Sequence, residues 1–148
     1  MTIKKHIRAL AISTVMMAVA IPSLAADSSW EIIDDNPAAS TYSYDPDSVA
    51  EAEEGLVTVR TRVVYTDEGK ADALDTIGNP TDFKDLTSTD FLYTINCSDG
   101  VSRLEKVIHR NGNGEIIKEY SLAGKTPWTE IEGETRMGLL REAVCDQP

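Results

Sequence analysis

A period-two pattern of side chains in residues 56–66 limits the fold of this chain more than any other feature of its sequence. Successive side chains of a strand point to opposite faces of a sheet, so a period of two predicts a strand with one buried face. The polar face carries Arg60 and Arg62, and one-sided strands of this kind are typical of antiparallel sheets. The opposite face, which we expect to be buried, carries Val57, Val59, Thr61, Val63 and Tyr65.

Three more strands are predicted further along the chain, at residues 90–98, 101–110 and 115–122. The dipeptide Asp-Gly joins the first two, and Asn-Gly-Asn-Gly joins the last two. Both sequences favour tight turns, so the three strands form a meander. The first of them places four side chains on one face: Phe91, Tyr93, Ile95 and Cys97.

Two short strands are expected before this region, at residues 30–33 and 40–45. The turn-forming sequence Asp-Asp-Asn-Pro ends the first, and a proline ends the second. A polar turn that closes at Gly55 then leads into the long strand. The sequence therefore predicts six strands.

Residues 67–89 follow no regular pattern, and the segment is too long for a structureless loop in a compact domain. A short helix is predicted at residues 71–77, where Gly-Asn-Pro then breaks it. We expect Phe83 and Leu86 to fix the rest of the segment to the body of the protein.

From Glu134 onward the apolar pattern becomes helical, and Cys145 ends it. The expected fold class is therefore α+β, with about six antiparallel strands and a C-terminal amphipathic helix on one face of the sheet. The apolar stripe of the helix consists of Met137, Leu140 and Val144, widened by Leu139 and Ala143.

Residues 1–25 have the three parts of a secretory signal: a positive start, an apolar run at residues 9–21, and small residues before a cut after Ala25. The run is shorter than the roughly 20 residues that span a bilayer, so a signal is favoured over a membrane anchor. No second run of that length follows. We therefore expect a bacterial export signal and one exported domain, residues 26–148, without a transmembrane segment.

Cys97 and Cys145 are the two cysteines of the chain, and in an oxidising compartment they most simply form one disulfide. Such a bond would close a loop of about 49 residues and hold the helix on the inner face of the sheet. A metal site, a redox pair and a catalytic thiol are the alternatives. A metal site needs more ligands, no Cys-x-x-Cys motif is present, and His109 is the only histidine beyond the leader.

The chain is strongly acidic, with 25 Asp and Glu against 14 Lys and Arg and a net charge of −11. Three of these cations lie in the predicted leader, which has no acid, so the exported domain carries −14. Nucleic-acid binding needs cationic surface, and anionic membranes repel an acidic protein. The charge therefore argues against nucleic acids, anionic membranes, and heparin-like or acidic matrix ligands.

No motif assigns a catalytic, metal-binding or cofactor-binding residue. The acidic stretch of residues 27–54 contains Asp-Pro-Asp-Ser at residues 45–48, which resembles the start of a calcium loop. A solvated turn in which Asp45 and Ser48 bond nearby backbone amides fits the sequence better. His109 is a candidate general base, but no motif supplies a nucleophile and an orienting acid, and a surface histidine is favoured.

Four side chains are candidates for contact with a partner. Trp30 and Trp128 are potential binding anchors, although in a small domain core packing is favoured. Arg60 and Arg62 are rare cations in an acidic protein. They either meet an acidic partner or pair with acids across the sheet, and pairing is favoured.

Several landmarks occur together in a fixed order over about residues 29–146, and together they resemble the surface-adhesin protein E family of Gram-negative bacteria. The landmarks are Trp-x-x-Ile at residues 30–33, Tyr-x-Tyr-Asp-Pro-x-Ser-Val at 42–49, Cys97 at a strand end, a Gly-Asn-Gly turn, a second Trp-x-x-Ile at 128–131, and Val144-Cys145.

The resemblance implies a six-stranded antiparallel sheet whose C-terminal helix is tethered to one face by a disulfide. It also implies a non-enzymatic domain, in the periplasm or at the outer surface, that binds a protein partner such as a host matrix or envelope protein. We expect any binding surface on the sheet face away from the helix or on residues 67–89. A small periplasmic hydrolase and an acidic metal-binding protein are the alternative functions.

Overall fold

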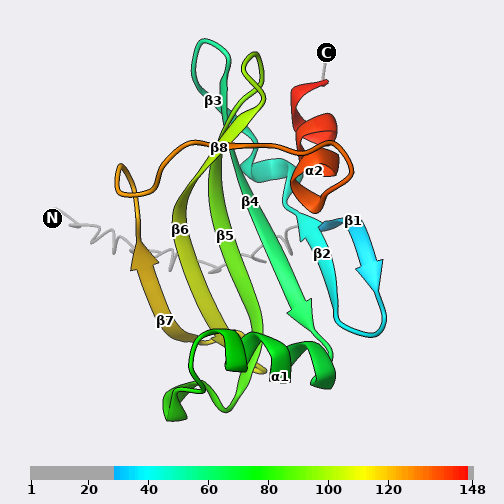
Figure 1. Cartoon of the computed structure of the whole chain (residues 1–148), viewed down its shortest axis with the longest axis vertical. Helices are drawn as coiled ribbons and strands as arrows, with labels where there is room; N and C mark the ends of the chain where they lie inside the picture. Colours follow the sequence, from blue (N-terminus) through cyan, green and yellow to red (C-terminus); the bar gives the residue numbers. More distant parts are fainter. Residues whose placement is uncertain (1–28, 147–148) are drawn as a thin grey trace, which may run out of the picture.

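One antiparallel sheet with both helices on the same side forms the body of the protein (Figure 1). The computed structural model describes residues 29–146, so the predicted signal lies outside the described residues. All six predicted strands are present, in the spatial order β1-β2-β4-β5-β6-β7. Their bounds are β1 Glu31–Asn36, β2 Ser40–Tyr44, β4 Leu56–Tyr65, β5 Leu86–Asn96, β6 Val101–Asn111 and β7 Ile116–Ser121.

The sheet also contains two short strands that the sequence does not predict. The strand β3 (Ala50–Glu53) pairs with β4 where a polar turn is expected, and β8 (Thr129–Glu130) pairs with the start of β6. The predicted end of β1 is also wrong, because pairing with β2 continues through Asp34 and Asp35. The Thr41 hydroxyl donates to the Asp35 carboxylate at 2.7 Å, so a cross-strand contact overrides the turn signal.

The segment of residues 67–89 is more ordered than the sequence predicts. Its helix α1 (Asp67–Thr76) begins four residues earlier than expected, where the Thr66 hydroxyl accepts a hydrogen bond from the Gly69 amide. A side chain at Gly69 would place its Cβ 1.8 Å from the Ala39 carbonyl oxygen. Glycine therefore lets α1 dock against the turn between β1 and β2.

A short 3-10 helix, η2 (Thr81–Phe83), follows α1 and leads into β5. Phe83 and Leu86 are buried, so the expected anchoring of this segment is confirmed. Leu86 starts β5 four residues before the predicted strand.

The helix α2 (Arg136–Cys145) lies on the same side of the sheet at one end, near β1, β2 and β4 (Figure 1), and the side facing it holds the core. The disulfide between Cys97 and Cys145 ties its last residue to the end of β5, which confirms the predicted tether. The core consists of Tyr44, Val59, Ile95, Ile131, Leu140 and Val144.

We expect removal of the disulfide to destabilise the domain strongly. The bond joins cysteines that are 48 residues apart, and in the chain-entropy model such a loop contributes about 4 kcal/mol. The variant Cys145→Ser should therefore lower the melting temperature by at least several degrees, as measured by circular dichroism. The double variant Cys97→Ser/Cys145→Ser is the control and should not respond to reductant. Equal melting curves of the native protein with and without reductant, with free thiols confirmed by labelling, would contradict the tether.

Candidate functional site

The side of β4, β5 and β6 that faces away from α2 is here called the outer face. Antiparallel pairing aligns its side chains in rows, because residues directly opposite one another share a face. One row contains Arg60, Leu92 and Lys106, and the next contains Arg62, Asp90 and Ile108. The strands thus place cations and apolar side chains next to one another on this face.

Three cations of the outer face were not predicted from the sequence: Arg103, Lys106 and Arg110. Between β5 and β6 the pairing shifts by one residue, so that Leu92 faces Lys106 while Thr94 faces Arg103. Arg103 and Lys106 are three residues apart and would lie on opposite faces of a regular strand, but this β-bulge places both on the outer face. A bulge leaves no clear signal in a single sequence.

Asp90 is the buried centre of the outer face. Arg62 donates from Nε to its Oδ1 at 2.5 Å and from Nη2 to its Oδ2 at 2.9 Å, and Arg110 donates from Nε to Oδ2 at 2.9 Å. Burial alone would raise the pKa of Asp90, but the hydrogen bonds and charges of the two arginines outweigh it and hold the pKa below its usual range. One carboxylate thus fixes two guanidinium groups.

A second buried carboxylate holds Arg60. Asp45 forms an ion pair with Arg60, and its Oδ1 accepts from the Asp47 amide at 3.1 Å at the start of the 3-10 helix η1 (Pro46–Ser48). The Ser48 hydroxyl accepts from the Arg60 amide at 2.8 Å. The residues of the calcium-like sequence therefore bind the backbone, as expected for a turn, and also position Arg60.

The two tryptophans lie beside arginines, and the predicted core packing is wrong. Trp128 is 41% exposed, and its ring lies 4.8 Å from the Arg103 guanidinium. Trp30 is half-buried, with Arg62 at 4.2 Å and Arg60 at 5.2 Å from its ring centroid. Each tryptophan covers the flat surface of a cation, and these contacts contribute to the outer face instead of the core.

Between these cations the outer face holds a groove of about 210 Å³, here called the outer groove. Leu92 and Ile108 supply its apolar lining, and Arg60 and Lys106 flank it. Arg60 is paired with buried Asp45, and Lys106 is 3.0 Å from Glu119 of β7. The predicted pairing of Arg60 and Arg62 with acids across the sheet is present in the structure.

His109 lies on the inner face and is half-buried, so its prediction as a surface residue is wrong. Its Nδ1 is 2.9 Å from the Thr89 hydroxyl, which also accepts from the Tyr65 hydroxyl at 3.0 Å. The rings of Phe83 and Tyr120 contact the imidazole edge-on. These contacts join β4, β5, β6, β7 and η2, and burial lowers the pKa of His109.

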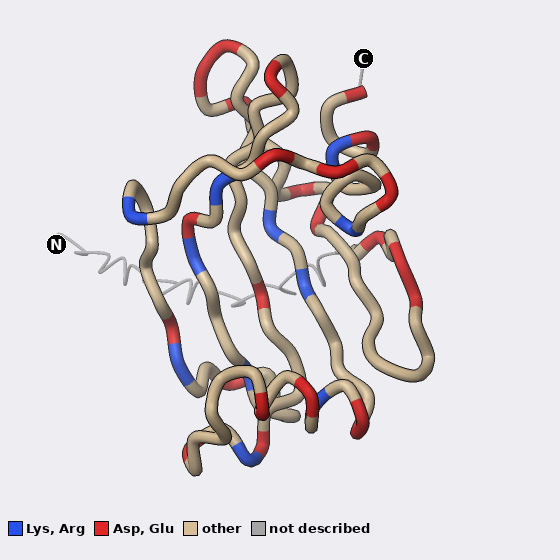
Figure 2. Tube along the Cα trace, viewed as in Figure 1, with Lys and Arg blue, Asp and Glu red and all other residues tan. Residues whose placement is uncertain are grey.

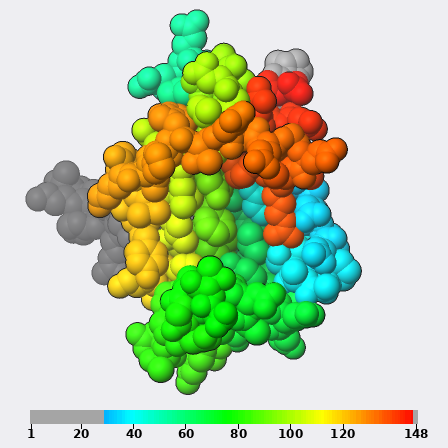
Figure 3. Space-filling view, in the orientation of Figure 1, coloured from blue at the N-terminus to red at the C-terminus, as the bar shows by residue number. Residues whose placement is uncertain are grey.

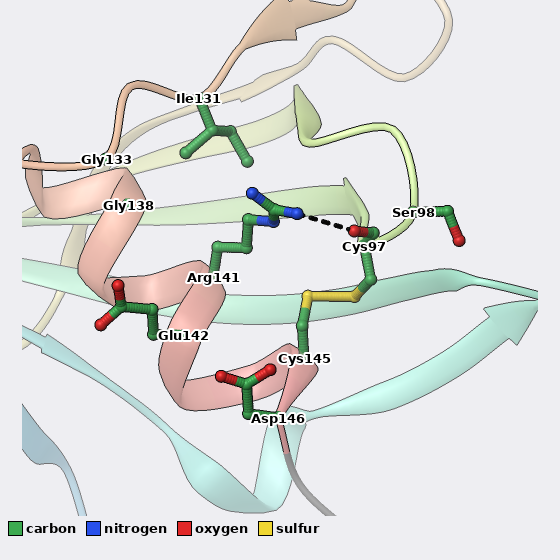
Figure 4. Close-up of a pocket in the computed structure, with 9 residues that line it drawn as sticks. All are labelled: Cys97, Ser98, Ile131, Gly133, Gly138, Arg141, Glu142, Cys145 and Asp146. Carbon is green, nitrogen blue, oxygen red and sulfur yellow. Dashed lines mark hydrogen bonds between the residues drawn. A yellow bond between two sulfur atoms is a disulfide. The ribbon is translucent and has the colours of Figure 1, made fainter.

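The inner face is surrounded by other parts of the chain. Figure 3 shows α1, α2 and the segment between β7 and α2 around a central area where β5 and β6 remain visible. A larger pocket of about 410 Å³ lies beside the disulfide, between α2 and the end of β5 (Figure 4). Arg141 extends into it and donates to the Cys97 carbonyl at 3.0 Å, with Glu142 and Asp146 nearby.

Charges are unevenly distributed over the fold. Figure 2 shows cations along the central strands, and acids mainly on the edge strand β1, on the helices and in the connecting segments. Among residues 29–146, no three Asp, Glu, His or Cys side chains are grouped closely enough to hold a metal ion. No helix in that range is long and apolar enough to span a membrane.

The fold is thus an antiparallel sheet with a disulfide-tethered C-terminal helix on one face and a cationic, partly apolar surface on the other. The chain belongs to the surface-adhesin protein E family, whose profile matches residues 30–146. No curated protein and no solved structure shows significant similarity to it. Family membership supports an adhesin-like role and a surface or exported location, and the disulfide fits a place outside the cytoplasm.

We expect Asp90→Asn to destabilise the protein by roughly 3 kcal/mol, because two buried guanidinium contacts lose their shared counterion. The pH dependence has a definite sign. A carboxylate whose pKa is lower in the folded state stabilises the fold above about pH 4, and this contribution is lost as the pH falls further. Urea unfolding at pH 7 and pH 3 should show a smaller difference between wild type and variant at pH 3.

The matched control for this variant is Asp85→Asn, which removes an exposed carboxylate near the start of β5. Its unfolding free energy should stay within about 0.5 kcal/mol of wild type. Equal stability of the two variants at pH 7 would contradict the central role of Asp90.

His109 should make stability depend on pH in a higher range. Its pKa is lower in the folded protein, so below about pH 6.5 the unfolded chain takes up a proton that the folded protein does not. The unfolding free energy of wild type should therefore fall between pH 7 and pH 5.5. In His109→Gln this fall should be absent, and an identical slope in both proteins would refute the assignment.

Proposed function

We propose that this protein is an exported, non-enzymatic domain that binds a protein partner, at the cell surface or in the periplasm, through the outer face of its sheet. Membership of the surface-adhesin protein E family supports adhesin-like binding. The signal-like residues 1–25 and the disulfide support export. A host matrix or envelope protein is the class of partner, and we propose no cofactor.

The composition of the outer face carries this proposal. Protein-binding surfaces are enriched in tryptophan and arginine and combine apolar contacts with a polar rim. Here Trp30 and two arginines lie together beside the apolar outer groove, and Val64 is 40% exposed on the same face. Both helices lie on the other side of the sheet (Figure 1).

Site-specific cross-linking in living cells tests the proposal. A photo-reactive amino acid replaces Val64 on the outer face, or Leu139 on α2 as the matched control, because the two side chains are 40% and 41% exposed. We expect illumination to yield a cross-linked protein from position 64 and none from position 139. Protease treatment of intact cells then shows whether the complex forms outside the outer membrane or within the periplasm.

Two outcomes would refute the proposed function. Cross-links from position 139 alone would place the partner on the helical side of the sheet. A cell fractionation that finds the protein in the cytoplasm would exclude an exported adhesin-like role. Thermal melting of both labelled proteins confirms beforehand that they are folded.

A further inference from the structure

We propose that the outer groove binds an acidic segment of the partner, in which carboxylates flank an apolar side chain. This inference rests on the proposed function, since it names the chemistry of the partner at the same face. It follows from the layering of charge on the outer face, from the order of side chains across the groove, and from the charge of the remaining protein.

Two carboxylates, Asp45 and Asp90, lie beneath the cations of the outer face, whereas Glu119 of β7, beside Lys106, is 41% exposed. The side chains of Asp45 and Asp90 are 3% and 2% exposed, whereas their partner Arg60 is 40% exposed and Arg62 is 27% exposed. An approaching molecule therefore meets guanidinium groups, while the carboxylates that hold them stay covered. Because these arginines are fixed in advance, a ligand loses less side-chain entropy on binding them.

The hydrogen-bond donors of Arg60 that Asp45 does not use also favour an acidic ligand. A guanidinium has five N–H groups, and Asp45 accepts from Nη2 of Arg60. The Nε atom of Arg60 is buried and has no acceptor within residues 29–146. A ligand cannot reach that buried atom, but the Arg60 side chain is 40% exposed, and carboxylate oxygens suit its exposed N–H groups because charge-assisted hydrogen bonds are the stronger ones.

The row across the groove places an apolar side chain between two cations. Arg60, Leu92 and Lys106 lie directly opposite one another on adjacent strands. Neighbouring strands are about 4.8 Å apart, so the two cations start from backbone positions roughly 10 Å apart. Ile108 extends the apolar lining beside this row. A segment that presents an apolar residue between two acids would match this order.

The remaining protein directs an acidic segment to this face. The chain carries a net charge of −11, and its acids lie mostly outside the central strands β4, β5 and β6 (Figure 2). An acidic ligand is repelled by those regions and attracted where exposed cations are concentrated. Electrostatic complementarity of this kind selects the docking site and suppresses other contacts.

The test uses the mature protein and fluorescein-labelled peptides, with binding followed by fluorescence anisotropy at low and physiological salt. The first peptide has glutamates on both sides of each leucine. In the second, lysine replaces every glutamate, and in the third, serine replaces every leucine. A heparin oligosaccharide is the fourth probe, because a polyanionic sugar would also be attracted to cations.

We expect the glutamate–leucine peptide to bind most tightly and to weaken as salt rises. Lys106→Glu should weaken its binding at least about tenfold, and Lys106→Ala by less, since it removes the charge without reversing it. The matched control is Lys125→Glu, which makes the same charge change at an exposed loop residue and should leave affinity within about twofold. Leu92→Ser should also weaken binding, with circular dichroism to confirm folding.

Each other outcome overturns this inference. Tighter binding of the lysine peptide would show that the groove takes another kind of segment and would leave the proposed function standing. Heparin binding that Lys106→Glu abolishes, without peptide binding, would assign the groove to a sugar. Absence of all binding would refute the acidic segment, and the cross-linking at Val64 would still decide separately whether the outer face meets a protein.

Discussion

The disulfide between Cys97 and Cys145 determines which face of the sheet is covered by α2 and which face is left open. It holds α2 against the inner face, where Leu140 and Val144 complete a core with Val59 and Ile95. A two-layer domain has one such core, and the other side of its sheet must meet solvent or a partner. Because both helices lie over the inner face, a buried polar group of the outer face such as Asp90 must find its partners within the same sheet.

The outer face meets this requirement with shared carboxylates. Asp90 accepts three hydrogen bonds from two arginines. Asp45 accepts one from Arg60 and one from the Asp47 amide of its own turn. Buried ion pairs add little net stability, because desolvation offsets much of their attraction. Their effect here is positional: they hold several cations in fixed places on a surface that has no second layer to support them.

The sequence predicts the parts of this structure that depend on local pattern. The alternation in residues 56–66 marks β4 and its two faces, and the apolar stripe marks α2. The start of α1 could not be predicted, because it depends on the close approach of Gly69 to Ala39, which are distant in sequence. Likewise, β3 forms because β4 offers it a free edge, although its own residues, alanine and glutamate, have a low strand propensity.

The candidate site was predicted only in part, for a related reason. Arg60 and Arg62 stand out because they alternate in a regular strand. Arg103 and Lys106 do not, since a bulge that depends on pairing with β5 brings them to the same face. The two tryptophans were assigned to the core because the domain is small, whereas neighbouring arginines hold them at the surface.

The net charge of the chain does not by itself determine the charge of the partner that the outer face attracts, for a physical reason. A sum over the chain treats all charges alike, but at physiological salt a surface charge acts over only about 8 Å. At the outer groove, Arg60 is exposed above the covered carboxylate of Asp45, and Lys106 is exposed beside Glu119, which is 41% exposed. The acidic remainder of the protein therefore does not cancel the attraction at this face. It instead confines an acidic partner to the one side of the sheet that the helices leave open.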